Sequence, residues 1–113
     1  SAIGWCLLAE NGEMTACAIG TALLGEGELL HIATKPEYRG KGYGFTLLCA
    51  VLDAMRGVGT ETVFLEVRES NAPAIGLYEK CGFAYCGRRK RYYRDPVEDA
   101  VLMACQLRLP AHG

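Results

Sequence analysis

Apolar and polar residues follow two different periods along this chain, and the change of period separates predicted strands from predicted helices. Three apolar, β-compatible runs come first, at residues 3–9, 14–23 and 28–34. The first two flank Asn11-Gly12, which predicts a hairpin because both central residues of a type I′ turn need a positive φ. The Gly-Glu-Gly sequence at residues 25–27 predicts the second turn.

A helical period begins after the glycines at residues 40–44. Five apolar residues recur on one face of a helix predicted over about residues 42–56: Leu47, Leu48, Val51, Leu52 and Met55. After a strand predicted at residues 61–67, the sequence SNAPAIGLYEKCGF predicts a second helix. It begins with a Ser/Asn cap, carries a proline in its first turn and ends before Gly82. Two more strands are predicted at about residues 84–91 and 100–107.

The predicted order is therefore three strands, a helix, a strand, a helix and two strands. Helices between strands require crossover connections, whereas hairpins require antiparallel pairing at the ends. We predict an α/β fold with a single mixed, mostly antiparallel central sheet and flanking helices. Because the chain has 113 residues and no linker-like segment, residues 1–113 are expected to form one domain.

Composition narrows the classes of function. Half of the residues are apolar and the net charge is −1, which favours a globular protein without a basic field for nucleic acid. No basic segment precedes a long apolar run at the N-terminus, and no apolar stretch reaches the ~18 residues of a membrane-spanning helix. We therefore expect a cytoplasmic protein that has no membrane partner.

The six cysteines lie within apolar periodic segments, and no Cys-x-x-Cys pair suggests a zinc site. Buried free thiols are the favoured interpretation. A two-residue turn at Asn11-Gly12 would place Cys6 opposite Cys17, although opposition alone does not satisfy disulfide geometry. His31 and His112 belong to no metal-ligand pattern, so no metal site is predicted.

The glycine stretch is the first candidate for chemistry. A strand, a short glycine-containing loop and a helix form an arrangement that binds phosphate, because the loop N–H groups and the first turn of the helix point toward the anion. Arg39 and Lys41 can add positive charge. The pattern matches neither GxxxxGK[ST] nor GxGxxG, which disfavours a P-loop and a Rossmann fold. A plain turn with a helix cap is the alternative interpretation.

Arg39-Gly40-Lys41-Gly42-Tyr43-Gly44 resembles the acetyl-CoA pyrophosphate loop, [RQ]-x-x-G-x-[GA], of the GNAT N-acetyltransferases. The resemblance continues through FLEVRESNAPAIGLYEKCGF and RRKRYYRDPVEDAVLM and covers about residues 28–107. Together, the three motifs resemble the ribosomal-protein alanine N-acetyltransferase (RimI-type) branch of that family. Members usually carry a further N-terminal strand and helical segment, which this sequence lacks. The chain is therefore expected to be an N-terminally truncated version of the fold, whose exposed core would favour a homodimer or strand exchange.

The resemblance also implies a set of site residues. Glu66 would be the catalytic base and Tyr78 the general acid for the departing CoA thiolate, whereas an exposed glutamate and a core tyrosine are the structural alternatives. Asn71 would contact the pantetheine arm or simply cap its helix. The backbone of residues 32–34 would pair with the pantetheine like an added strand. The cofactor-binding set implied by the resemblance is Ile32, Ala33, Thr34, Arg39, Gly40, Lys41, Gly42, Tyr43, Gly44, Phe45 and Asn71.

The sequence RRKRYYR contains the main basic cluster, around Tyr92 and Tyr93. A solvated strand edge and a nucleic-acid patch are both open interpretations, and the net charge disfavours the second. In similar acetyltransferases the Tyr-Tyr hairpin holds the acceptor peptide, which makes these two residues the substrate-binding candidates. Glu98 and Asp99 could attract the acceptor ammonium or balance the arginines.

The sequence thus predicts acetyl transfer from acetyl-CoA to a protein N-terminal α-amine by direct attack, with no metal. Two alternatives remain at this point. One is a CoA-binding or partner-binding module without catalysis, which the missing N-terminal segment suggests. The other is an acetyltransferase for a small amine or a lysine side chain, because acceptor loops vary on a common fold.

Overall fold

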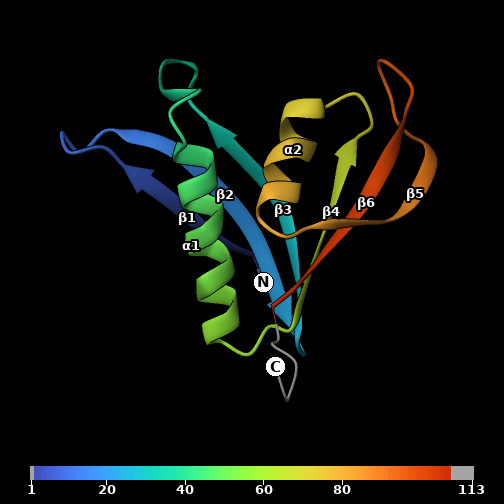
Figure 1. Cartoon of the computed structure of the whole chain (residues 1–113), viewed down its shortest axis with the longest axis horizontal. Coiled ribbons are helices and arrows are strands. Elements are labelled where there is room, and N and C mark those ends of the chain that lie inside the picture. Colours follow the sequence, from blue (N-terminus) through green and yellow to red (C-terminus); the bar gives the residue numbers. More distant parts are fainter. Residues whose placement is uncertain (1, 108–113) are drawn as a thin grey trace.

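In the computed structural model, which describes residues 2–107, one six-stranded sheet carries two α-helices (Figure 1). Its elements in chain order are β1 (Ala2–Leu8), β2 (Met14–Leu23), β3 (Glu26–Thr34), the 3-10 turn η1 (Pro36–Tyr38), α1 (Tyr43–Gly57), β4 (Thr62–Arg68), α2 (Ala72–Lys80), β5 (Ala84–Tyr93) and β6 (Glu98–Gln106). The predicted order of strands and helices is confirmed, and most bounds shift by one or two residues.

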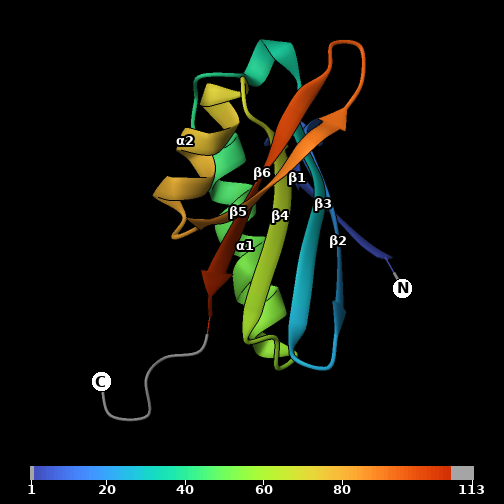
Figure 2. The ribbon, with the colours of Figure 1, turned by 90° about the vertical axis from the view of Figure 1, so that its right-hand side faces the viewer.

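The sheet has the order β1-β2-β3-β4-β6-β5, and only the β3–β4 pair is parallel. The mixed, mostly antiparallel sheet is therefore confirmed. Both helices lie on the same face of the sheet, which leaves the opposite face uncovered in the described part of the chain (Figure 2). Each helix lies in a crossover connection between strands, α1 between β3 and β4 and α2 between β4 and β5.

The turns differ from the sequence prediction. Asn11 does not adopt a positive φ, and Gly12 alone does, at 85°. Gly12 N–H donates to Ala9 O at 2.9 Å and Ala9 N–H to Glu13 O at 2.8 Å, so the first hairpin closes through a longer loop than a two-residue type I′ turn. The second turn lies at Leu24 and Gly25, with φ of 51° and 84°, rather than at residues 25–27.

Cys6 lies opposite Cys17 as predicted, because a bulge near Leu8 restores the register that the longer loop would otherwise change. All six cysteines are free thiols. The prediction that they are buried is wrong for most of them: Cys105 is buried, whereas Cys6 and Cys86 are exposed. Burial raises the pKa of the Cys81 thiol to about 12, with further contributions from Cys49 and Cys105 nearby.

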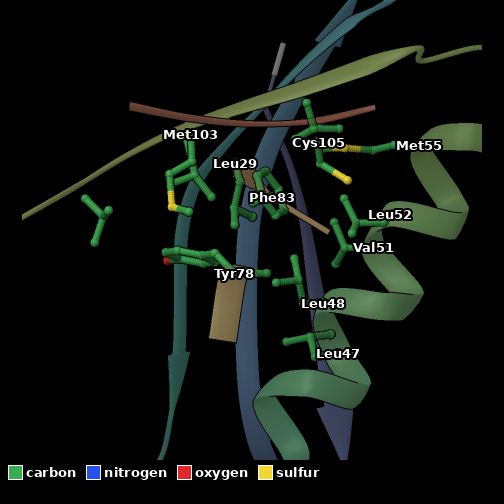
Figure 3. Packing of buried hydrophobic residues seen from close by; sticks show 14 of the residues in the cluster. Leu29, Leu47, Leu48, Val51, Leu52, Met55, Tyr78, Phe83, Met103 and Cys105 are labelled. Atoms are coloured by element: carbon green, nitrogen blue, oxygen red, sulfur yellow. The ribbon is translucent and has the colours of Figure 1, made fainter. Parts of the chain in front are cut away.

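The core lies between the sheet and the helices. The five periodic residues of α1, from Leu47 to Met55, are all buried, as their spacing predicted. Figure 3 shows them directed into a cluster with Leu29 of β3, Tyr78 of α2 and Met103 of β6. On β4 the buried residues alternate with more exposed ones, so Phe64, Glu66 and Arg68 lie on the face away from the helices.

Candidate active site

The central feature of the candidate site is the point where β3 and β4 separate. Their parallel pairing covers Glu26↔Thr62 to Glu28↔Phe64 and ends there within the described chain. Beyond it the two strands diverge, and α2 lies over the opening (Figure 1). Residues 32–34 keep β2 as a neighbour on one side. Their other edge faces the opening, where an extended ligand can form strand-like hydrogen bonds.

A groove of about 670 Å³ lies beside this opening. Eight of the predicted cofactor-binding residues line it: Ile32, Ala33, Thr34, Arg39, Gly40, Gly42, Gly44 and Phe45. Gly40 and Gly42 adopt φ of 75° and 83°, a region that glycine enters without a steric cost. At Gly44 a Cβ would lie 3.3 Å from Thr34 Oγ1, so the chain approaches β3 more closely here than a side chain easily allows.

Three predicted cofactor-binding residues are not among those that line the groove. Asn71 is the N-cap of α2, where its Oδ1 accepts a hydrogen bond from Ala74 N–H at 3.3 Å. Lys41 places its Nζ 5.9 Å from the Tyr38 ring centroid, and Tyr43 packs edge-on against the same ring. Lys41 and Tyr43 therefore contact the η1 segment, which Glu13 also holds by accepting a hydrogen bond from Tyr38 Oη at 2.8 Å.

The second wall of the groove is a face of α2 that sequence reasoning did not assign to the cofactor. It consists of Pro73, Ala74, Gly76, Leu77 and Lys80. Their spacing of three and four residues, together with two small residues, was a usable signal for a helix face that admits a ligand. Lys80 adds a cation at the end of this face, with Nζ 5.1 Å from the centroid of the Phe45 ring.

A second cavity, of about 510 Å³, adjoins Glu66 and is lined by residues from five strands. Phe64 and Glu66 of β4, Glu28 of β3, and Arg89 of β5 are part of this lining. Glu28, Arg89 and the other lining residues were not assigned from sequence, because they come together only through the register of strands distant in the chain.

Glu66 makes two contacts in this cavity. Arg89 Nε lies 3.6 Å from Glu66 Oε1, and interaction of the Tyr92 hydroxyl with the Glu66 carboxylate is the main cause of a raised pKa for Tyr92. The Arg89 guanidinium also lies over the Tyr92 ring, 5.7 Å from its centroid. Arg89 therefore lies next to both the predicted base and one of the two predicted acceptor-binding tyrosines.

Tyr78 lies on the helical side of the sheet, in the core, and is not among the residues that line the groove or the cavity. Its ring is 8% exposed and packs at 5.8 Å, edge to face, against Phe83. Burial raises the pKa of Tyr78, and charge on Tyr93 would raise it further. Burial and the charge of Glu66 raise the pKa of Tyr93 in turn. The phenol of Tyr78 therefore stays protonated at neutral pH.

Two acidic residues of the β5–β6 hairpin bind arginines, one on β5 and one on β4. Asp99 Oδ2 accepts a hydrogen bond from Arg88 Nη1 at 3.0 Å, and Glu98 Oε2 accepts one from Arg68 Nη1 at 3.0 Å. Of the two roles that the sequence left open for Glu98 and Asp99, charge balance is the one that these contacts support. No group of three or more His, Cys, Asp or Glu residues suited to a metal occurs among residues 2–107, and His112 lies outside them. No helix in that range is long and apolar enough to cross a membrane.

Comparisons with known proteins agree with this architecture. The acetyltransferase (GNAT) family matches residues 1–83. The [ribosomal protein bS18]-alanine N-acetyltransferase of Escherichia coli K12 is 44% identical over 99 residues, which are 86% of this chain and 67% of that protein.

Two solved structures extend the comparison. The crystal structure of the ribosomal-protein-S18-alanine N-acetyltransferase from Escherichia coli has a TM-score of 0.88 at 38% identity, covering 99% of this chain and 73% of that one. The NatC complex bound to Gag peptide and CoA has a TM-score of 0.79 at 26% identity, covering 84% of this chain and 62% of that one. The family match spans well over half of the chain and the resemblance in sequence agrees with the resemblance in fold, so this chain belongs to the acetyltransferase (GNAT) family.

Proposed function

We propose that the chain transfers the acetyl group of acetyl-CoA to the α-amine of a protein N-terminus, with Glu66 as the base and Tyr78 as the acid. The observation that carries the proposal is the separation of β3 from β4. It leaves the groove beside residues 32–34 and the cavity beside Glu66 on the two strands that diverge. The Escherichia coli relative is named a [ribosomal protein bS18]-alanine N-acetyltransferase, and the NatC complex was solved with a peptide and CoA bound; both support a protein acceptor.

The residues that line the groove fit acetyl-CoA. N–H groups at the start of α1 have no helical partner and suit a pyrophosphate, and the glycines let it approach the backbone. Arg39 and Lys80 supply positive charge at the groove. Arg39 Nε donates to Thr34 O at 3.2 Å, which fixes this side chain against β3 while its terminal nitrogens stay available for phosphate.

When bound, acetyl-CoA supplies an activated thioester. An α-amino group has a pKa of ~7.7–8.0, so a base is useful at neutral pH to take its proton. Glu66 accepts that proton as the new N–C bond forms. Tyr78 donates its proton to the CoA sulfur as the C–S bond breaks, and its raised pKa keeps that proton in place beforehand. Tyr92 and Tyr93 hold the acceptor beside Glu66.

The experiment measures single-turnover acetylation of a peptide that begins with alanine, using Glu66→Gln and Tyr78→Phe. Each is expected to reduce turnover by about 10²-fold or more, the usual scale of acid–base catalysis, with the dissociation constant of acetyl-CoA unchanged. Glu79→Gln and Tyr85→Phe make the same chemical changes at exposed positions to which no role is assigned, and they serve as controls for the substitution itself. Rates like those of the unmodified chain in both Glu66→Gln and Tyr78→Phe would rule out this assignment.

The acceptor class needs its own measurement. Peptides that begin with Ala, Ser, Met or Thr are compared with a peptide whose only free amine is a lysine and with a small polyamine. The proposal expects turnover with an N-terminal series and not with the other two acceptors. Turnover restricted to lysine or the polyamine would change the acceptor, and acetyl-CoA binding measured by calorimetry without any turnover would indicate a binding module.

A further inference from the structure

The β5–β6 hairpin carries an irregularity next to Glu66. The register runs from Arg89↔Ala100 directly to Tyr93↔Glu98, so residues 90–92 face the single residue Asp99. Arg91 in this bulge has a φ of 51°. Bulges of this kind occur near active sites, where they turn a side chain away from the direction that regular pairing would give it. Here the bulge directly precedes Tyr93 and contains Tyr92, whose ring lies 5.7 Å from the guanidinium of Arg89, which in turn pairs with Glu66 at 3.6 Å.

Arg68 connects the far end of this hairpin to β4. Its Nη2 donates to Arg94 O at 2.9 Å, and its Nη1 donates to Pro96 O and to Glu98 Oε2, both at 3.0 Å. Its guanidinium carbon also lies 4.5 Å from the centroid of the Tyr93 ring. One side chain therefore contacts four residues between 93 and 98. Glu98 in turn accepts a hydrogen bond from Ser70 N–H at 3.0 Å, which joins the hairpin to the segment before α2.

This set of contacts requires an arginine. A guanidinium presents five N–H donors in a rigid plane, so it can bond to several oxygens while its face stacks on an aromatic ring. A lysine ammonium has the same charge, but its compact head cannot reach both backbone oxygens and lie flat on Tyr93. The Arg68 side chain is one third exposed, so these bonds are partly shielded from water.

Arg68 also has a fixed relation to the candidate base. Glu66 and Arg68 are two residues apart on β4 and therefore lie on the same face of the strand. The strand that carries the base thus also holds the hairpin that carries the acceptor-binding tyrosines. A shift of the hairpin would separate Tyr92 and Tyr93 from Glu66 without changing the cofactor groove, which lies at other residues.

We infer that Arg68 is a positioning residue for acceptor binding: it holds Tyr92 and Tyr93 beside Glu66 by binding the backbone and side chains of residues 93–98. The inference rests on the proposed function, because it assigns the hairpin to the acceptor. Arg68 acts through the two tyrosines and contacts neither the acceptor nor acetyl-CoA. The competing explanation is that Arg68 only stabilises the fold.

The test compares Arg68→Gln and Arg68→Lys with Arg56→Gln, in the full chain. Arg56 is a matched control, since it also binds a carboxylate, that of Asp53 at 2.7 Å, and a backbone oxygen, that of Leu107 at 3.2 Å, but lies on α1 away from the site. Steady-state kinetics with the alanine peptide give KM and kcat, calorimetry gives the dissociation constant of acetyl-CoA, and hydrogen exchange reports on the amides of residues 90–98.

Arg68→Gln is expected to raise the KM for the peptide at least about tenfold, the scale of one charge-assisted hydrogen bond, with acetyl-CoA binding within about twofold of the unmodified chain. Exchange at residues 90–98 rises with it. Arg68→Lys keeps the charge, but its KM for the peptide is expected to stay close to that of Arg68→Gln. Arg56→Gln is expected to leave the KM for the peptide unchanged.

Two outcomes overturn the inference. In one, the peptide KM of Arg68→Gln equals that of the Arg56→Gln control. In the other, Arg68→Lys restores the KM fully, which would make charge rather than geometry the cause. These outcomes differ from a failure of the proposed function, in which the unmodified chain itself acetylates no peptide N-terminus and the inference falls with it.

Discussion

Replacing Gly42 with alanine tests whether the glycine loop has the conformation that binds the cofactor. Gly42 is the N-cap of α1, with φ of 83° and ψ of 5°, and its carbonyl accepts the first helical hydrogen bond, from Thr46 N–H at 3.0 Å. An added Cβ would meet no atom within 4 Å. The substitution therefore introduces no collision, and its cost comes from the left-handed backbone alone.

That cost is about 1–2 kcal/mol for a residue with a Cβ. If the loop of Gly42→Ala keeps its conformation, the free energy of unfolding falls by that amount, which lowers Tm by roughly 4–8 °C in a domain of this size. If the loop of Gly42→Ala relaxes to another conformation instead, the free energy of unfolding changes little. Acetyl-CoA must then restore the strained conformation on binding, and its dissociation constant rises about 5–30-fold. The loss in the free energy of unfolding and the loss in the free energy of acetyl-CoA binding must therefore add up to the same 1–2 kcal/mol.

Urea unfolding and calorimetric titration with acetyl-CoA measure the two parts on one preparation. Gly57→Ala is the control within the same helix, because Gly57 has no positive φ and an added Cβ there meets nothing within 4 Å. It is expected to stabilise the chain by about 0.5–1 kcal/mol and to leave acetyl-CoA binding unchanged. The reasoning fails if the two losses in Gly42→Ala together come to less than about 0.5 kcal/mol.

Two further predictions concern charge. Lys80→Gln is expected to raise the dissociation constant of acetyl-CoA about 2–10-fold at low ionic strength and less at high salt, because Lys80 lines the groove. Calorimetry at two salt concentrations tests this expectation. Lys90→Gln, on the exposed hairpin, should change neither the dissociation constant nor its salt dependence. Hydrogen bonds from Arg91 N–H and the Arg88 side chain lower the pKa of Asp99. The stability that Asp99 contributes is therefore present above its unfolded pKa of ~3.9 and is lost as the pH falls through the lower folded value. Below about pH 4, the unmodified chain should lose stability to urea more steeply with falling pH than Asp99→Asn. Parallel curves of stability against pH for the two proteins would contradict a stabilising role for the Asp99 carboxylate.

Local patterns predicted the parts of the fold that depend on one element at a time. The apolar period of α1 identified a buried face because a helix core position recurs every three or four residues. The alternation on β4 placed Glu66 on the face opposite the core for a similar reason. The resemblance of the glycine loop supplied the groove residues of β3 and α1, which are contiguous in sequence.

Features that depend on pairing between distant strands were not predictable. The second turn uses Leu24 at a φ of 51°, which propensities disfavour and which the pairing of β2 with β3 imposes. The bulge at residues 90–92 has no glycine or proline to mark it, and it is held by Asp99 of β6, which accepts a hydrogen bond from Arg91 N–H. The spacing of small residues on α2 indicates a face that can admit a ligand, but which element that face opposes depends on where the helix packs.

The end of the β3–β4 pairing connects these observations. Parallel strands joined through α1 would be expected to continue pairing, since each unpaired N–H and C=O on a strand needs another partner or water. Pairing instead stops after Glu28↔Phe64, which exposes one edge of β3 at residues 32–34. On the other side of the opening, β4 stays paired with β6 as far as Arg68↔Ala100, so β4, like β3, keeps one paired neighbour and has one open edge there. The two strands differ in the side chains around the opening: the groove with the glycine loop lies beside residues 32–34 of β3, whereas Glu66 and Arg68 lie on β4. This difference favours binding the cofactor on β3 and orienting the acceptor from β4.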